Sequence, residues 1–147
     1  MSQEESDNGP LESARTRRAD LKAALSAVEI AAASPAGAEG WSAELGAALI
    51  GLREAFDDHV REVEDPEGLL DALRDDAPHL SHQINEVQEE HPAVEAQIDE
   101  ASEMLRGDAT PEEIREAVLA ALSAIARHRQ HGADLVYHAY SVDIGGE

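Results

Sequence analysis

The fold is decided by the stretch WSAELGAALIGLREAFDDHVREVEDP, residues 41–66. Apolar side chains and one histidine recur in it every three or four residues, the spacing of one face of an α-helix: Leu45, Leu49, Leu52, Phe56, His59 and Val63. The pair Asp65-Pro66 ends the pattern, because the residue before a proline is disfavoured in the helical conformation. We therefore predict an amphipathic helix over 41–64 that begins near Trp41.

The same spacing extends outward in both directions along the chain. It predicts further long helices over 11–34, 78–106 and 111–140, and a short helix over 66–74 that turns the corner. Long helices with short connections are typical of bundles, so we predict an all-α fold, an up-down-up-down four-helix bundle. The alternative is a flatter helical array that dimerises through a shared face.

The domain organisation follows from these helices. We predict a disordered acidic tail over 1–10, the bundle over 11–140 and an exposed C-terminal tail over 141–147. The N-terminal residues form no signal peptide, and no apolar run approaches the roughly 20 residues of a membrane span. We therefore expect a cytoplasmic protein.

Charge and composition exclude several classes of function. The 147 residues contain 32 acidic and 11 basic side chains, a formal net charge of −21, which opposes binding to nucleic acids and to anionic membranes. Cysteine is absent, so thiolate nucleophiles and cysteine-ligated metals are excluded. No glycine-rich phosphate loop is present, and no serine has an inward histidine and carboxylate beside it. We therefore expect a binding protein rather than an enzyme.

Histidines are the most informative residues in the chain. His59, His91 and His128 fall on the apolar stripes of three predicted helices, within the same half of the predicted bundle, whereas His79 and His82 fall on the polar side. Inward imidazoles on facing helices can be metal ligands. Each can equally be a neutral core histidine that is hydrogen-bonded to a hydroxyl, the backbone or water.

Two other histidine patterns lie off the apolar faces. The spacing of His82 and Glu86 suits a helix-face metal site, but their polar side favours a solvated pair. His131, Asp134 and His138 share a rough stripe. That stripe fits a surface metal site, a salt-bridged face or an oligomer contact.

Three segments that carry histidines resemble the hemerythrin-like (HHE) cation-binding family: LREAFDDHVREVEDPEGLLDAL (52–73), NEVQEEHPAVEAQIDEAS (85–102) and SAIARHRQHGADLVYHAY (123–140). The likeness covers about residues 15–140. In that family a helix supplies a histidine followed four residues later by a glutamate. The resemblance implies a four-helix bundle that binds iron or another divalent transition metal.

The chain departs from the family's pattern where carboxylate ligands are expected. Val63 and Gly132 stand four residues after the histidines of their segments. Glu64 and Asp134 lie close by in the sequence but are predicted to turn away, and Glu90 is predicted to lie off the centre of its stripe. The family's di-iron, oxygen-binding chemistry is therefore not expected intact.

The first predicted helix departs from the family too. Arg18 falls on the apolar stripe of that helix and is predicted to face inward, and Arg18 or Lys22 occupies the region where the family places a histidine. A cation there repels a metal ion.

Two functions remain from the sequence. The first is a hemerythrin-like metal-binding or sensing protein with a reduced site formed by His59, His91 and His128, holding iron or another divalent transition metal. The second is a metal-free helical scaffold or protein-interaction module. Its partner is either a second copy, giving a homodimer, or an unidentified protein.

Overall fold

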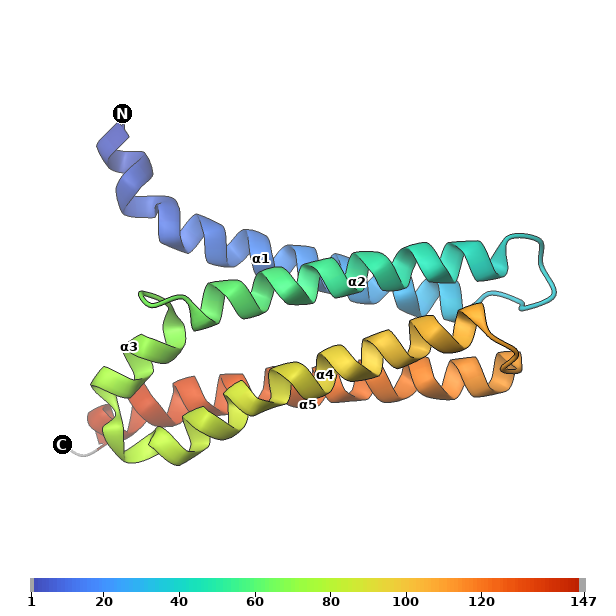
Figure 1. The fold of residues 1–147 in the computed structure, drawn as a ribbon. Helices are drawn as coiled ribbons and strands as arrows, with labels where there is room; N and C mark the ends of the chain where they lie inside the picture. The colour runs from blue at the N-terminus through green and yellow to red at the C-terminus, as the bar shows by residue number, and fades with distance from the viewer. Residues whose placement is uncertain (1, 146–147) are drawn as a thin grey trace. The chain divides into compact units, whose positions relative to one another are not determined.

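The computed structural model describes the backbone of residues 2–145 and the side chains of residues 12 and 15–141. Within 2–145 the chain is helical and holds no β-strand (Figure 1), which confirms the predicted all-α class. The elements are α1 (Ser2–Ala33), α2 (Trp41–Glu64), α3 (Leu69–Asp76), the 3₁₀ turn η1 (Pro78–Leu80), α4 (Ser81–Arg106) and α5 (Pro111–Gly145).

Several helix boundaries differ from the prediction. The corner helix α3 begins at Leu69 rather than Pro66, and η1 precedes α4 where the sequence predicted one continuous helix from 78. The helices α1 and α5 also extend into the stretches predicted as tails, 1–10 and 141–147. Of these tails, Met1 and residues 146–147 lie outside the described residues, as do the side chains of 1–10 and 142–147.

The chain forms two compact units, residues 1–62 and 63–147, here called unit one and unit two. Unit one holds α1 and most of α2, joined by the connection over 34–40 (Figure 1). Gly40 has a φ of 86°, a conformation that favours glycine, and it directly precedes the first residue of α2. That residue is Trp41, as predicted, and its side chain is buried.

The predicted stripe of α2 is buried at Leu45, Leu49, Leu52 and Phe56. On α1 the buried face runs through Leu21, Val28 and Ala31.

The prediction that Arg18 faces inward is wrong, because Arg18 and Lys22 are both exposed. The buried face of α1 is turned so that Arg17, four residues before Leu21, is the half-buried cation. Its guanidinium lies 3.5 Å from the carboxylate of Asp58 and 3.7 Å from that of Glu62. These ion pairs join α1 to α2 within unit one.

Unit two contains α3, α4 and α5, and α4 packs along α5 after the connection over 107–110 (Figure 1). The start of α5 has the reciprocal cap that its sequence indicates. The Thr110 backbone N–H donates to Glu113 at 2.8 Å, and the Glu113 backbone N–H donates to the Thr110 hydroxyl oxygen at 3.2 Å. This cap lowers the pKa of Glu113, since the hydrogen bonds favour the charged carboxylate.

The core of unit two joins all three of its α-helices. Val63, which stands where the hemerythrin-like pattern has a carboxylate, packs against this apolar cluster together with Leu80 and Val136. The side chain of Val63 therefore contributes to apolar packing. The buried members of the cluster are Leu70, Leu73, Ala77, Ile84, Val87, Leu135 and Ala139.

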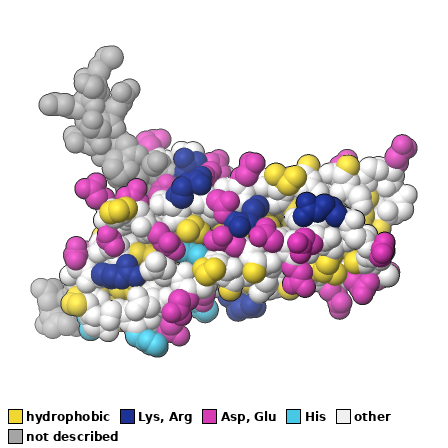
Figure 2. All heavy atoms as spheres, in the orientation of Figure 1, with side chains coloured by type: hydrophobic (Ala, Val, Ile, Leu, Met, Phe, Trp, Pro, Cys, Tyr) yellow, Lys and Arg dark blue, Asp and Glu magenta, His cyan; other side chains and the backbone are white. Residues whose placement is uncertain are grey.

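The surface is strongly acidic. Figure 2 shows Asp and Glu side chains spread over the visible faces of both units, with few cations between them. Among the described residues, no helix combines the length and the apolar character needed to cross a membrane.

Candidate metal centre

His91 is a buried residue at the middle of α4, with 1% of its surface exposed. Its Nδ1 lies 2.5 Å from a carboxylate oxygen of Glu64, the last residue of α2. A carboxylate only accepts hydrogen bonds, so Nδ1 of the imidazole carries a proton, and in the neutral ring the lone pair lies on Nε2. Pro92 follows directly and α4 continues through it, without the N–H that would bond one turn back.

His128 on α5 has the same arrangement with a different carboxylate. It is 4% exposed, and its Nδ1 lies 2.8 Å from one oxygen of Glu90 on α4. The other oxygen of Glu90 lies 2.6 Å from Nδ1 of His131, which is half exposed. One carboxylate therefore accepts hydrogen bonds from two imidazoles on the neighbouring helix.

The two buried imidazoles lie against each other. The ring centroids of His91 and His128 are 4.7 Å apart, with the ring planes at 72° in an edge-to-face arrangement. One nitrogen of each ring lies within 4.8 Å of a nitrogen of the other. Two imidazole donors from adjacent helices are therefore close enough to share one metal ion after small side-chain adjustments, since metal–nitrogen bonds are about 2.0–2.1 Å for zinc.

The electrostatics of this site favour a neutral His128 and a charged Glu90. Burial lowers the pKa of His128, and this outweighs the opposing effect of the hydrogen bond that His128 donates to Glu90. For Glu90, burial is the largest single contribution and raises the pKa. The hydrogen bonds and charges of His128 and His131 together outweigh it and lower the pKa overall. A neutral imidazole is the form that binds a metal ion.

The remaining histidines are distributed as follows. His59 is half-buried on α2 in unit one, where its ring centroid lies 5.5 Å from that of Phe56. That His59 lies close to the two buried histidines stays a prediction from the sequence. His79 and His82 are exposed, as predicted. His82 and Glu86 form a solvated contact at 3.5 Å.

Among the described contacts, the side chains of His131, Asp134 and His138 each have a different partner. Asp134 accepts a hydrogen bond from Gln130, and the exposed His138 lies against the ring of Tyr137. Only His131 reaches α4, through Glu90.

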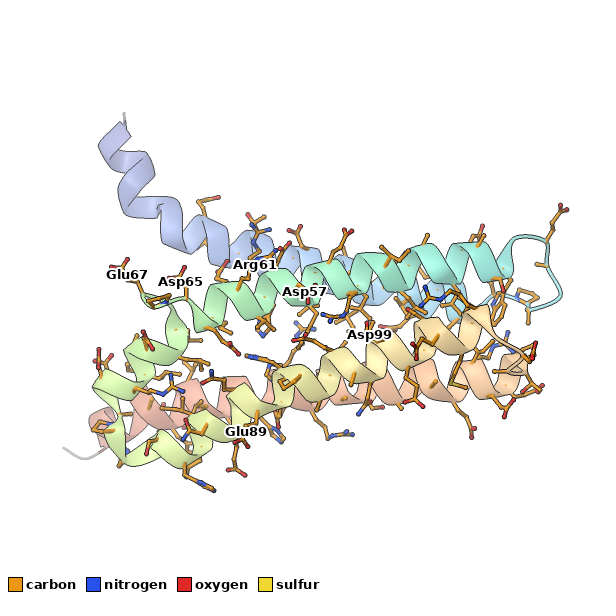
Figure 3. All side chains as sticks on the ribbon, in the orientation of Figure 1. Asp57, Arg61, Asp65, Glu67, Glu89 and Asp99 are labelled. Atoms are coloured by element: carbon orange, nitrogen blue, oxygen red, sulfur yellow. The ribbon has the colours of Figure 1, made fainter. Side chains whose placement is uncertain are left out.

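The sequence prediction for Glu64 is wrong, and that for Glu90 holds but misses its partner. Glu64 does not turn away: it occupies the last turn of α2, where its side chain reaches back to α4 and His91. Glu90 is off the centre of its stripe, as predicted, but that position puts it at the boundary facing α5. Its neighbour Glu89 points to solvent (Figure 3). Glu90 directly precedes the inward His91 in the sequence, and this position was the signal that its carboxylate lies near the buried histidines.

Comparisons with protein-family models, curated proteins and solved structures found no match to the chain. The hemerythrin-like resemblance therefore stays an expectation from the sequence.

Proposed function

We propose that this protein binds a divalent transition metal, iron or another, through His91 and His128. The observation that supports it is that each buried imidazole is held at Nδ1 by a carboxylate, Glu64 or Glu90. Metal-binding histidines commonly have such a carboxylate on the ring nitrogen that does not bind the metal. The carboxylate fixes the tautomer and the orientation of the ring, and it makes Nε2 a better donor.

The charges around the two imidazoles suit a doubly positive ion. An imidazole binds a metal ion in its neutral form, and the two carboxylates behind these rings contribute two negative charges close to the site. Imidazole nitrogen favours zinc, copper, iron and nickel over calcium and magnesium, which prefer oxygen. A bound ion of this class supplies Lewis acidity or redox chemistry, and the four residues supply binding and orientation.

His59 is our proposed third ligand, on the sequence argument alone. The family's di-iron set fits the described residues poorly, because Val63 packs in an apolar cluster and Gly132 has no side chain. We therefore propose a reduced site. The up-down-up-down bundle, its hemerythrin-like character and the cytoplasmic location likewise remain proposals, as does the absence of nucleic-acid and membrane partners.

The second candidate function is a metal-free helical interaction module. The same two hydrogen bonds support it, because they also satisfy buried histidines without any metal. Large apolar side chains that stand exposed on several helices would supply contacts to a second copy or another protein: Ile30, Ile50, Leu119 and Tyr137.

Metal binding by purified protein separates the two candidates. Protein made without a histidine tag is analysed for bound metal, stripped with a chelator, and titrated with Co²⁺ while its visible spectrum is recorded. We expect one ion per chain and a ligand-field spectrum of nitrogen coordination. His91→Asn and His128→Asn keep a donor near the position of Nδ1 but lack Nε2, so both should lose the ion while circular dichroism stays helical.

His79→Ala and His82→Ala are the matched controls, because both residues are exposed and lie outside the site. They should bind Co²⁺ as the wild type does. His59→Ala tests the third ligand: weaker binding supports it, and unchanged binding limits the site to unit two. No metal in the wild-type protein and no spectral change on titration would favour the interaction module.

A further inference from the structure

We infer that His131 is a positioning residue of the buried site, acting on His128 through Glu90. This inference rests on the proposed function, since it assigns a surface residue to the same metal site. It adds a residue that the proposed ligand set does not include.

The contacts form one continuous path from solvent to the buried ring. His131 Nδ1 lies 2.6 Å from Oε2 of Glu90, and Oε1 of the same carboxylate lies 2.8 Å from Nδ1 of His128. The side chains are 50%, 29% and 4% exposed in that order. The two histidines are three residues apart on α5, so their side chains lie on neighbouring positions of one helix face.

The hydrogen bond that His131 donates restrains the Glu90 carboxylate, which the contact with His128 alone leaves less fixed. A glutamate side chain loses considerable rotamer freedom when it is fixed, and a partly exposed carboxylate also has water as a competing partner. His131 holds the outer oxygen, which restricts the carboxylate to the orientation that receives His128. With both oxygens engaged by imidazoles, Glu90 acts behind the ligand rather than as a ligand.

Two substitutions at 131 separate this role from a merely structural one. Asparagine carries its amide nitrogen near the position of histidine Nδ1, so His131→Asn retains the donor to Glu90. His131→Ala removes it. His138→Ala is the control on α5 for loss of an exposed histidine, and Glu89→Ala is the control on α4 for loss of an exposed carboxylate.

The first measurement is made on metal-free protein. Long-range ¹⁵N–¹H spectra of histidine-labelled protein report which ring nitrogen carries the proton. We expect His128 and His131 to be protonated at Nδ1 in the wild type. Glu90→Ala should abolish that preference at both rings. His131→Ala should reduce it at His128, and His131→Asn should restore it. An unchanged His128 signal in His131→Ala overturns the inference.

The second measurement is Co²⁺ affinity. Loss of the carboxylate behind a metal-binding histidine typically costs about 10- to 100-fold, which we expect for Glu90→Ala. His131→Ala should bind more weakly than the wild type but better than Glu90→Ala. His131→Asn, His138→Ala and Glu89→Ala should match the wild type.

The two proposals fail in different ways. A wild-type protein that binds no Co²⁺ overturns the proposed function and this inference together. A wild-type protein that binds Co²⁺, with His131→Ala binding equally well, overturns the inference alone.

Discussion

Nδ1 of His91 donates a hydrogen bond to the carboxylate of Glu64 over 2.5 Å, although the two residues are 27 positions apart in the chain. Glu64 ends α2, and α3 and η1 then lead the chain to α4. This contact places a proton on Nδ1 of the buried histidine. Replacing His91 therefore also removes the hydrogen-bond donor of Glu64.

His91→Leu distinguishes a ligand from a core residue. Leucine is apolar and of similar volume, and Glu64 is 30% exposed, so water can solvate the carboxylate that loses its donor. If His91 only fills the core, the metal-free variant should melt at or above the wild-type temperature. If it is a ligand, the variant should lose the metal and the stabilisation that metal binding provides.

Paired melting curves with and without Co²⁺ measure this difference. We expect the wild type to gain melting temperature with Co²⁺ and His91→Leu to gain none. An equal gain in both proteins would contradict the role of His91 as a ligand.

The stability of the protein should fall as the solution becomes acidic. Burial lowers the pKa of His128 below its ordinary value of 6.5, so the unfolded chain binds this proton more readily than the folded one. Stability is therefore undiminished above about pH 6.5 and decreases as the pH falls from there toward the folded pKa. The pKa of Glu90 is lowered from 4.5, so its contribution is present above that value and lost below it.

Urea unfolding at pH 8, 6.5 and 5.5 in the presence of a chelator measures the effect of His128. His128→Asn should show a shallower decrease than the wild type, because it removes the buried titrating group. His82→Ala removes an exposed histidine and should keep the wild-type slope. Equal slopes in all three proteins would show that His128 does not control the acid sensitivity.

Much of the fold was predictable because local signals agreed with one another. The apolar spacing of α2, its end before Asp65-Pro66 and the capping sequence at Thr110 each depend on residues close in the chain. The burial of His91 and His128 followed from the same helical spacing.

The polar partners of the site were not predictable in the same way. Glu64 and Glu90 are displaced from the apolar stripes, and each reaches a histidine on another helix. Such contacts depend on the rotation of each helix and on side-chain reach, which a period of 3.6 residues does not specify. The prediction for Arg18 failed for the same reason. The orientation of α1 differs by a small rotation from the predicted one, so Arg17 lies at the boundary of the buried face in place of Arg18.

Gly132→Ala should stabilise the protein. Gly132 lies inside α5, where glycine costs about 1 kcal/mol relative to alanine. No described atom beyond its chain neighbours and the nearby backbone of its own helix lies within 4 Å of an added Cβ, so the methyl group meets no obstacle. We expect the free energy of unfolding to rise by roughly 0.5–1 kcal/mol in urea titrations.

Gly51→Ala is the matched variant on α2, where an added Cβ also has open space. A similar gain there would show that helix propensity is the cause. Destabilisation by Gly132→Ala alone would mean that position 132 has a packing role beyond its helix.

Salt should raise the stability of this protein, contrary to its effect on an isolated surface ion pair. At a net charge of −21, the acidic side chains repel one another more strongly in the compact state than in the unfolded chain. The ion pairs that salt weakens, such as Arg17 with Asp58, are partly exposed and individually contribute about 0–1 kcal/mol. The Debye length, over which charges interact before salt screens them, shortens from about 10 Å at 0.1 M to about 3 Å at 1 M.

Thermal melts from 0.05 to 1 M NaCl should therefore show a steadily rising melting temperature. A variant with Asp75→Asn, Glu89→Gln and Glu100→Gln carries a formal charge of −18, since three exposed carboxylates of the −21 are neutralised. With less repulsion to screen, it should be more stable at 0.05 M and respond less to salt. If salt raises both proteins equally, the stabilisation arises from the general effect of salt on apolar burial, because that effect does not depend on these charges.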